Sequence, residues 1–363
     1  MNDSLLDKIT ARENLFFKEV QDVIDKGYNL YIWGAARGAK HVANKLDHAG
    51  LPYCGFVINE KFLKDNHNEH TYSLEWILTH TPKKIGLIVA FNGFRTEMLD
   101  IYKDKIYKLI DRDCFEGNEN TTIDDISYEW CVRNEDLLQH FYEELEDDFS
   151  KKTLIAYINQ KISLDYKYVR PVKKSEQYFD DEILDLKDDE VLIDCGAFTG
   201  DSVDCFINTL QKKGISSYDG IYSFEPDNDN FQKLIENKRD KQICLNVGCA
   251  DYTGEVSFGG DGSTNSQIRD DGEQKIKIDT IDNVLSGKRA SIIKMDIEGA
   301  ELSALKGAEQ TIKMYHPTLA ICIYHKKEDL FEIPNYIKSL DSTYHFYARI
   351  YAYSATEFVL YAI

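Results

Sequence analysis

The chain has 363 residues, which is enough for two domains with separate hydrophobic cores. Its apolar content of 43% and its charged content of 29% are ordinary for a soluble globular protein. The formal net charge of −20 argues against nucleic-acid partners and anionic membranes, because both attract surfaces rich in Lys and Arg.

Eight cysteines are scattered along the chain without a C-x-x-C pair, which argues against a zinc ribbon or a thioredoxin-like site. No apolar run reaches the length of a membrane-spanning helix. The first twelve residues also lack the apolar core of a signal peptide. We therefore expect a chain without a membrane span that works in the reducing cytoplasm.

Residues 1–115 show the alternation of a small α/β domain. A helical pattern to about residue 26 precedes strand patterns at 28–33, 53–58, 85–91 and 106–110. The turn Gly34–Ala39 resembles the first turn of Rossmann-like domains, with Ala36 and Ala39 at the second and third fingerprint positions. Alanine at the second position hinders the approach of a pyrophosphate. The turn leaves open whether this domain binds a cofactor, docks a sugar nucleotide or only assembles the protein.

From about residue 121 to residue 165 the pattern is helical, and a connector follows at 171–181. The acidic run Glu143–Asp148 reads as the solvated face of a helix in this segment. We predict a Rossmann-like domain at 1–115, a helical linker at 116–180 and a second α/β domain at 181–363.

In the second domain, strand patterns stand at 191–193, 221–224, 243–247, 292–295 and 319–324. Two final strands, at 345–351 and 357–361, are joined by a turn so short that they must pair antiparallel, whereas the earlier strands need crossover connections. The predicted fold class is α/β, with a mainly parallel sheet that ends in an antiparallel hairpin.

The most informative segment, Glu190–Asp201, reads E-V-L-I-D-C-G-A-F-T-G-D. A buried strand enters the turn Gly196–Gly200, a helix follows, and a second strand ends in Glu225 before Pro226. Glycines let the backbone approach a ligand, and an acid at the second strand end can hold both hydroxyls of a ribose. The spacing is not the G-x-G-x-x-G that suits a pyrophosphate, so NAD is disfavoured here. Acids around the turn suit a cation: Asp194, Asp201, Glu225, Asp296 and Glu298.

Four pieces in order resemble the FkbM family of methyltransferases that depend on S-adenosylmethionine (SAM). They are V-L-I-D-C-G-A-F-T-G-D, Y-S-F-E-P-D, N-V-G-C-A-D-Y-T-G and I-I-K-M-D-I-E-G-A-E-L-S-A-L-K-G-A. The K-x-D-x-E-G-x-E core of the last piece reads Lys294, Asp296, Glu298, Gly299 and Glu301. The resemblance covers about half of the chain. It implies a class I methyltransferase fold, SAM as methyl donor with S-adenosylhomocysteine (SAH) as product, and a sugar, glycan or sugar-nucleotide acceptor.

The resemblance also implies a role for each residue near the turn. Gly196 and Gly200 let the turn wrap the amino-acid part of SAM, and Glu225 accepts the ribose hydroxyls. Thr199 and Asp201 reach the methionine carboxylate or only cap the helix. Asp251 binds the adenine amino group or is a plain turn residue. The expected cofactor-binding set is Asp194, Gly196, Ala197, Phe198, Thr199, Gly200, Asp201, Glu225, Pro226, Asn246, Asp251 and Asp296.

Methyl transfer is an in-line displacement that needs alignment, and a hydroxyl acceptor also gains from a general base. The expected catalytic residues follow the fourth and fifth strands, where Asp296, Glu298 and His325 stand. His325 or Asp296 is the predicted base, and a structural histidine is the alternative for His325. Asp296 and Glu298 offer oxygen ligands for Mg²⁺, but no further acid stands at a suggestive spacing, so we expect no metal.

The main prediction is a SAM-dependent O-methyltransferase that acts on a small molecule or glycan and can form a homo-oligomer. One alternative is a nucleotide-sugar-modifying or NAD-dependent enzyme that uses the first domain. Another is a SAM-binding assembly module without catalysis. The segment Gly259–Ser266 reads as a surface turn or as a lid over the substrate.

Overall fold

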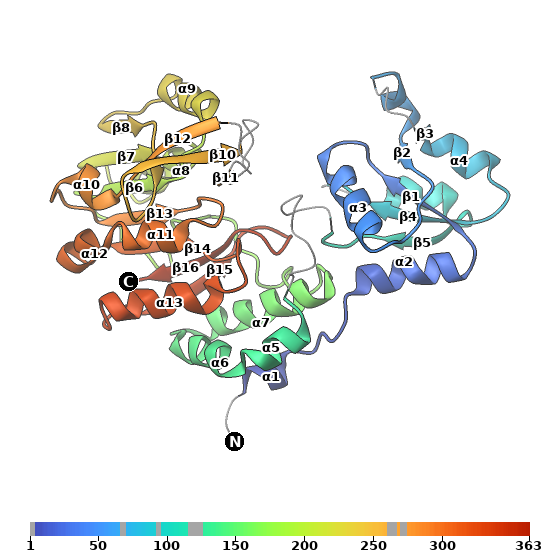
Figure 1. Cartoon of the computed structure of the whole chain (residues 1–363), viewed down its shortest axis with the longest axis horizontal. Helices are drawn as coiled ribbons and strands as arrows, with labels where there is room; N and C mark the ends of the chain where they lie inside the picture. Colours follow the sequence, from blue (N-terminus) through green and yellow to red (C-terminus); the bar gives the residue numbers. More distant parts are fainter. Residues whose placement is uncertain (1–3, 66–69, 92–95, 115–125, 260–266, 269–273) are drawn as a thin grey trace. The chain divides into compact units, whose positions relative to one another are not determined.

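The computed structural model describes residues 4–65, 70–91, 96–114, 126–259, 267–268 and 274–363 (Figure 1). Contacts group the chain into two compact units. The large unit comprises Met1–Lys8, Asn134–Ala156 and Pro171–Ile363, and the small unit comprises Ile9–Arg133 and Tyr157–Arg170. The two units therefore share the helical segment that we expected as a separate linker. The boundaries 1–115, 116–180 and 181–363 stay a prediction about independent folding.

The small unit is built on a sheet of five parallel strands in the order β3-β2-β1-β4-β5. The strand order reverses between β1 and β4, as in a doubly wound α/β sheet, which agrees with the predicted Rossmann-like domain. The strand β3 was not predicted, because three residues are too few to show a periodic pattern. The strands are β1 (Asn29–Trp33), β2 (Phe56–Ile58), β3 (Thr71–Ser73), β4 (Ile85–Val89) and β5 (Ile106–Ile110).

Helices cover both faces of this sheet. Leu30 and Ile32 of β1 pack in one apolar cluster with α2 and α3. Tyr31 and Trp33 lie in the other cluster with α4, because successive side chains of a strand point to opposite faces. The helical elements are α2 (Leu15–Asp25), α3 (Arg37–His48), α4 (Leu74–His80), α5 (Tyr128–Arg133) and the 3₁₀ helices η1 (Glu60–Asp65) and η2 (Thr96–Tyr102).

The large unit is built on a seven-stranded sheet in the order β15-β16-β14-β13-β6-β7-β8 (Figure 1). β16 pairs antiparallel with β14 and with β15, and the remaining pairs are parallel. The predicted parallel sheet with a C-terminal hairpin is confirmed. The strands are β6 (Val191–Cys195), β7 (Gly220–Phe224), β8 (Gln242–Leu245), β13 (Ile292–Met295), β14 (Thr318–Cys322), β15 (Phe346–Ile350) and β16 (Phe358–Ala362).

A second, four-stranded sheet in the order β11-β10-β12-β9 was not predicted. Its strand β12 alternates exposed lysines with the buried Ile276 and Ile278, a period-2 signal that could have revealed it. The predicted turn or lid after Gly259 falls at residues 260–266, outside the described residues. The strands are β9 (Gly248–Cys249), β10 (Gly254–Gly259), β11 (Gln267–Ile268) and β12 (Gln274–Asp279).

The helices assigned to the large unit follow or flank its strands. α7 belongs to it only as far as Ala156. Over the described ranges, no helix combines the length and the apolar character needed to cross a bilayer. The helices are α1 (Leu5–Lys8), α6 (Glu135–Glu144), α7 (Asp148–Ser163), α8 (Asp201–Lys212), α9 (Asn228–Glu236), α10 (Ile281–Leu285), α11 (Glu301–Lys306), α12 (Glu309–Tyr315) and α13 (Asp329–Leu340).

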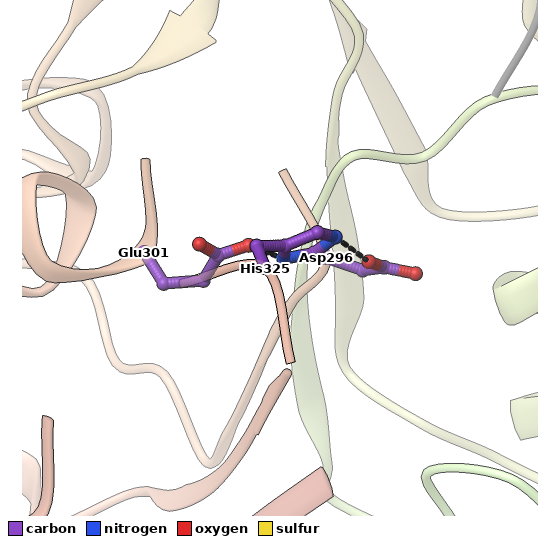
Figure 2. Close-up of side chains that lie close together, drawn as sticks. All are labelled: Asp296, Glu301 and His325. Atoms are coloured by element: carbon purple, nitrogen blue, oxygen red, sulfur yellow. Dashed lines mark ion pairs between the residues drawn. The ribbon is translucent and has the colours of Figure 1, made fainter. Parts of the chain in front are cut away.

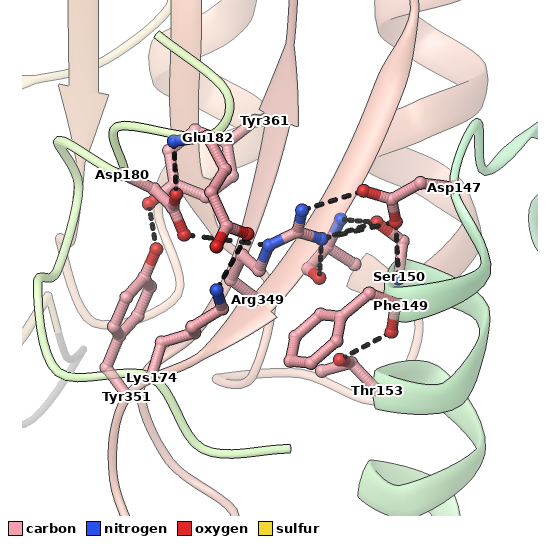
Figure 3. Close-up of polar contacts among 11 residues, drawn as sticks. Asp147, Phe149, Ser150, Thr153, Lys174, Asp180, Glu182, Arg349, Tyr351 and Tyr361 are labelled. Atoms are coloured by element: carbon pink, nitrogen blue, oxygen red, sulfur yellow. Dashed lines mark hydrogen bonds and ion pairs between the residues drawn. The ribbon is translucent and has the colours of Figure 1, made fainter.

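A buried arginine ties the break between α6 and α7 to the sheet edge (Figure 3). Arg349 of β15 is 2% exposed and donates from Nη2 to Asp147 Oδ2 at 2.7 Å and from Nη1 to Ser150 Oγ at 2.8 Å. Its guanidinium lies 4.9 Å from the centre of the Phe149 ring. The interpretation of Glu143–Asp148 as one solvated helix face is wrong at Asp147, because α6 ends at Glu144 and the buried guanidinium has Asp147 as its counter-ion, whereas Glu143, Glu146 and Asp148 are exposed as expected.

Candidate active site

The turn after β6 is shaped by the end of the neighbouring strand β13. Gly196 has a φ of +77°, and a β-carbon placed on it would lie 1.9 Å from the backbone oxygen of Asp296. Because β6 and β13 pair in parallel, their ends meet at this point. A glycine is therefore required here by packing, whatever ligand the turn binds.

The helix α8 begins directly after the turn, with Gly200 as its N-cap residue at a φ of +96° and without a side-chain cap bond. Neither Thr199 nor Asp201 holds the N-cap position, but Asp201 Oδ1 accepts from the Ser202 N–H of the first turn at 3.0 Å, so the capping alternative stays open for Asp201. The backbone oxygen of Thr199 accepts a hydrogen bond from Asn237 at 3.1 Å, and the Asp201 side chain is exposed. Both side chains stay predicted ligands of the cofactor.

Glu225 lies at the end of β7 and is 6% exposed. Its Oε2 accepts from the Phe198 N–H at 2.8 Å and its Oε1 accepts from the Asp227 N–H at 2.9 Å. Burial raises the pKa of Glu225 to about 7, although the two N–H groups oppose the shift. The Asn246 amide donates to the backbone oxygens of Glu225 and Pro226 at 3.0 and 3.2 Å. The carboxylate is thus fixed on both sides.

A buried ion pair lies under the turn. Lys294 of β13 and Asp194 of β6 have side chains that are 2% and 0% exposed, and Nζ lies 3.1 Å from Oδ1. The ammonium also donates to the backbone oxygen of Gly196 at 2.7 Å. Burial opposes the charge on Lys294, but the carboxylates of Asp194 and Asp296 raise its pKa above the usual value. Asp194, a predicted cofactor ligand, is therefore the counter-ion of Lys294.

Asp296 follows β13 and accepts hydrogen bonds from two tyrosines. Tyr178 donates to Oδ2 at 2.7 Å and Tyr324 donates to Oδ1 at 3.1 Å. Burial would raise the pKa of Asp296, but Lys294, His325 and these hydroxyls outweigh burial and lower it below the usual value. Asp296 is consequently ionised at neutral pH.

His325 follows β14 and lies between carboxylates. Figure 2 shows Glu301 and Asp296 on opposite sides of its ring. Nδ1 lies 2.9 Å from Glu301 Oε1, and Nε2 lies 3.5 Å from Asp296 Oδ1 and 3.8 Å from Glu298 Oε2. Burial would lower the pKa of His325, but Glu301 and the two other acids raise it to about 10. The imidazole is therefore positively charged at neutral pH.

Two further acids near Asp296 resist ionisation. Burial raises the pKa of Glu298 to about 7, and the pKa of Glu357, from the hairpin end, to about 7. Both residues have a φ of +56°, and Phe198 has a φ of +47°. Side chains other than glycine seldom adopt this left-handed conformation, which commonly marks functional sites.

The structure brings the predicted catalytic residues Asp296, Glu298 and His325 together, as parallel strand ends should. It places Asp251 apart from them, on the surface, where its Oδ1 accepts from Ser303 at 2.9 Å. Sequence reasoning missed four participants. Glu301 and Lys294 stood in the quoted motif, whereas Tyr178 lies in the predicted connector and Glu357 at the start of the last predicted strand, with no sign of a role in the site.

The expectation that no metal is bound stays a prediction, and Glu298 belongs to neither group of possible metal ligands around Asp296. Among the described residues, two groups place one possible metal-ligand atom per residue within 4.8 Å of one another. They are Asp296 with Glu301 and His325, and Asp296 with Cys322 and Glu357. Glu301 stands near Asp296 in the quoted motif, whereas His325, Cys322 and Glu357 are far from Asp296 along the sequence.

Comparison with known families agrees with this architecture. Residues 194–345 match the family described as the methyltransferase FkbM domain. The chain contains an FkbM methyltransferase domain. The match begins at Asp194 in the strand that enters the glycine turn, and it includes the segment Lys294–Glu301.

Two similar proteins extend the comparison of the FkbM domain. The chain is 27% identical over 138 residues to the hexuronic acid methyltransferase AglP of Haloferax volcanii. That match spans 36% of this chain and 54% of AglP, so it reaches only about half of the relative. The crystal structure of the methyltransferase FkbM from Methylobacillus flagellatus KT has a TM-score of 0.77 at 23% identity. It covers 99% of this chain and 97% of that chain, so the likeness in fold includes both units.

Proposed function

We propose that the chain transfers the methyl group of SAM to a hydroxyl group of a sugar, glycan or sugar nucleotide. The observation that carries this proposal is the fixed carboxylate of Glu225 at the end of the second parallel strand. Phe198 and Asp227 each donate one backbone N–H to it, and each oxygen keeps a lone pair for a ribose hydroxyl. The acids around Asp296 suit the positive sulfonium of SAM.

The acceptor class rests on AglP, whose name states that it methylates a hexuronic acid. A hydroxyl must lose its proton as its oxygen attacks the methyl group. Glu298 is the group that we assign to receive it, because a pKa of about 7 suits a general base near neutral pH. Asp296, whose pKa is lowered, is a weaker base, and the charged His325 balances these acids.

The glycine turn of the small unit gives less support to the alternatives in which this unit binds a nucleotide sugar or NAD. The second strand β2 is followed by Asn59, whose amide donates to Glu75 Oε1 at 3.1 Å. An amide nitrogen that is so engaged does not replace the carboxylate that grips a ribose. We place the reaction in the large unit. We also propose that it takes place in the cytoplasm, since all eight cysteines are free thiols.

The test is transfer of a labelled methyl group from SAM to a panel of sugars and sugar nucleotides that includes hexuronates. We expect methylation of at least one panel member, and Glu298→Gln should lower turnover by about 10²–10⁴-fold while SAH still binds. Full turnover in Glu298→Gln would refute the assigned base. SAH binding without transfer to any panel member would favour the assembly module over the enzyme.

A further inference from the structure

The ammonium of Lys326 lies on the backbone of the loop that carries Glu298. Lys326 follows His325 and has an exposed side chain. Its Nζ donates to the backbone oxygen of Gly299, the residue directly after Glu298. A β-carbon placed on Gly299, which has a φ of +94°, would lie 3.1 Å from Lys326 Cε and 3.7 Å from Nζ. The lysine stem therefore packs against this glycine, and its positive charge is held beside the residue that follows the assigned base.

The positive groups described above, Lys294 and His325, are already committed to carboxylates of the protein. The Lys294 side chain is 2% exposed and pairs with Asp194. The His325 side chain is 8% exposed and lies between Glu301 and Asp296. Neither group can meet a molecule that enters from solvent without losing contact with its own counter-ion.

The charge of Lys326, in contrast, is not neutralised by the protein. An ammonium has three N–H donors, and the oxygen of Gly299 takes one of them. Among the described residues, no carboxylate forms an ion pair with Nζ, whereas the neighbouring Lys327 pairs with Glu328 at 4.0 Å. Asp329 accepts from the backbone N–H of Lys326 at 3.1 Å, so its hydrogen bond is to the main chain. Two donors and a positive charge are therefore available to a ligand.

An exposed cation has a particular value at this site because the groups around the assigned base are acids. Asp296 and Glu357 lie close enough to Glu298 to raise its pKa by charge repulsion, in addition to the effect of burial. The same acids would repel an anionic acceptor, which needs a cation to offset the repulsion, whereas a neutral acceptor needs none. Lysine binds carboxylates and phosphates alike, because its ammonium is a point charge without a fixed fork geometry.

We propose that Lys326 binds a carboxylate or phosphate group of the acceptor and thereby selects a charged sugar over its neutral counterpart. This inference rests on the proposed function, because it takes the hydroxyl that is methylated to lie next to Glu298. Glu298 and Gly299 are consecutive, so their Cα atoms are about 3.8 Å apart. One sugar ring with its anionic substituent can therefore span from the base to the ammonium. The anionic group belongs to the sugar that is methylated or is attached directly to it.

The test is calorimetric titration of the SAH-saturated full chain with three probes that differ in one group, D-glucuronate, D-glucose 1-phosphate and D-glucose. We expect at least one charged probe to bind about tenfold more tightly than D-glucose, and the probe that does so identifies the anion as carboxylate or phosphate. Lys326→Met should abolish this preference, and Lys326→Arg should keep it. The preference should also fall as salt is added, because salt screens an exposed charge pair.

The matched control is Lys313→Met, which removes the same charge from another exposed position. Lys313 Nζ pairs with Glu309 Oε1 at 2.5 Å on α12, and the two side chains are 49% and 45% exposed. This substitution should leave all three affinities unchanged. If Lys326→Met does not fold, Lys326→Gln serves in its place.

The proposal is overturned if the native chain binds neither charged probe more tightly than D-glucose, or if the preference survives in Lys326→Met. It is also overturned if Lys326→Met weakens SAH binding, which would assign the ammonium to the cofactor. Equal losses for charged and neutral probes would show that Lys326 only holds Gly299 in place, which would refute the proposal as well.

Labelled-methyl transfer on the same samples separates this inference from the proposed function. Binding of a charged probe that depends on Lys326, without transfer to any sugar, would count against the proposed function and leave the anion site standing. Transfer to sugars without any preference for charge would count against the role of Lys326 alone.

Discussion

The chain holds two glycine turns that follow the first strand of a parallel sheet, one in each unit. Gly34, after β1, has a φ of +136°, and its missing β-carbon would lie 3.2 Å from the backbone oxygen of Ala90, beyond β4. Gly196, after β6, faces the backbone oxygen of Asp296, beyond β13, in the same way. In both units the glycine makes room for the end of the adjacent strand.

The two turns differ in the charged groups around them. The turn of the large unit rests on the pair Asp194–Lys294 and faces Glu225, whereas the second strand of the small unit ends at the amide of Asn59. A glycine turn is therefore a property of the fold. The buried carboxylates are what point to a nucleoside with a positive charge.

The largest effect should come from the ion pair under the turn of the large unit. Lys294→Met leaves Asp194 buried without its counter-ion and removes a donor to Gly196, which should lower the free energy of unfolding by about 3–5 kcal/mol. Denaturant unfolding measures this loss in the free energy of unfolding. The control is Arg289→Met, since Arg289 forms an exposed pair with Asp189 at 2.9 Å that should contribute less than about 1 kcal/mol. Equal losses in the two variants would show that the buried pair does not support the turn.

The next effect compares the two glycines directly. Gly196→Ala forces a β-carbon into the backbone at 1.9 Å and should lower the free energy of unfolding by about 3 kcal/mol or more. Gly34→Ala meets its nearest atom at 3.2 Å and should cost about 1–3 kcal/mol, mainly from strained backbone. Thermal or denaturant unfolding of both variants decides this order. A larger loss for Gly34→Ala would contradict it.

A smaller effect should appear in the pH dependence of SAH binding. Burial raises the pKa of Glu225 to about 7, and only the ionised carboxylate can accept two ribose hydroxyls. Affinity should therefore be full above pH 7 and fall as the pH drops through 7, by about tenfold between pH 8 and pH 6. Calorimetry over this range measures it, and Glu225→Gln should remove the dependence. An affinity that rises toward pH 6 would contradict this role.

The fold and part of the site were predictable because they follow from strand order. Strand patterns ending at Met295 and at Tyr324 placed Asp296 and His325 at one edge of the sheet, where the structure has them. The approach of Tyr178 and Glu357 was not predictable. Tyr178 lies in the predicted connector and Glu357 begins the last predicted strand, and tertiary packing alone brings both to Asp296. Short strands such as β3 were not predicted either, because they have too few residues to show a periodic pattern.

The pKa of a site residue also lies beyond sequence reasoning. His325 reads as a possible base in the sequence, yet its acidic neighbours raise its pKa to about 10. Glu298 is a catalytic candidate in the sequence but not the predicted base, yet burial raises its pKa to about 7. These shifts depend on burial and on distances to charges, which no spacing along the chain reveals.

The most direct test of the central claim is calorimetric SAH binding to two variants that truncate the matching strand-end residues, Glu225→Ala and Asn59→Ala. The account predicts that Glu225→Ala weakens SAH binding by at least about 100-fold while Asn59→Ala leaves it unchanged. Native affinity in a folded Glu225→Ala variant, or a loss confined to Asn59→Ala, would contradict the assignment of the cofactor to the large unit.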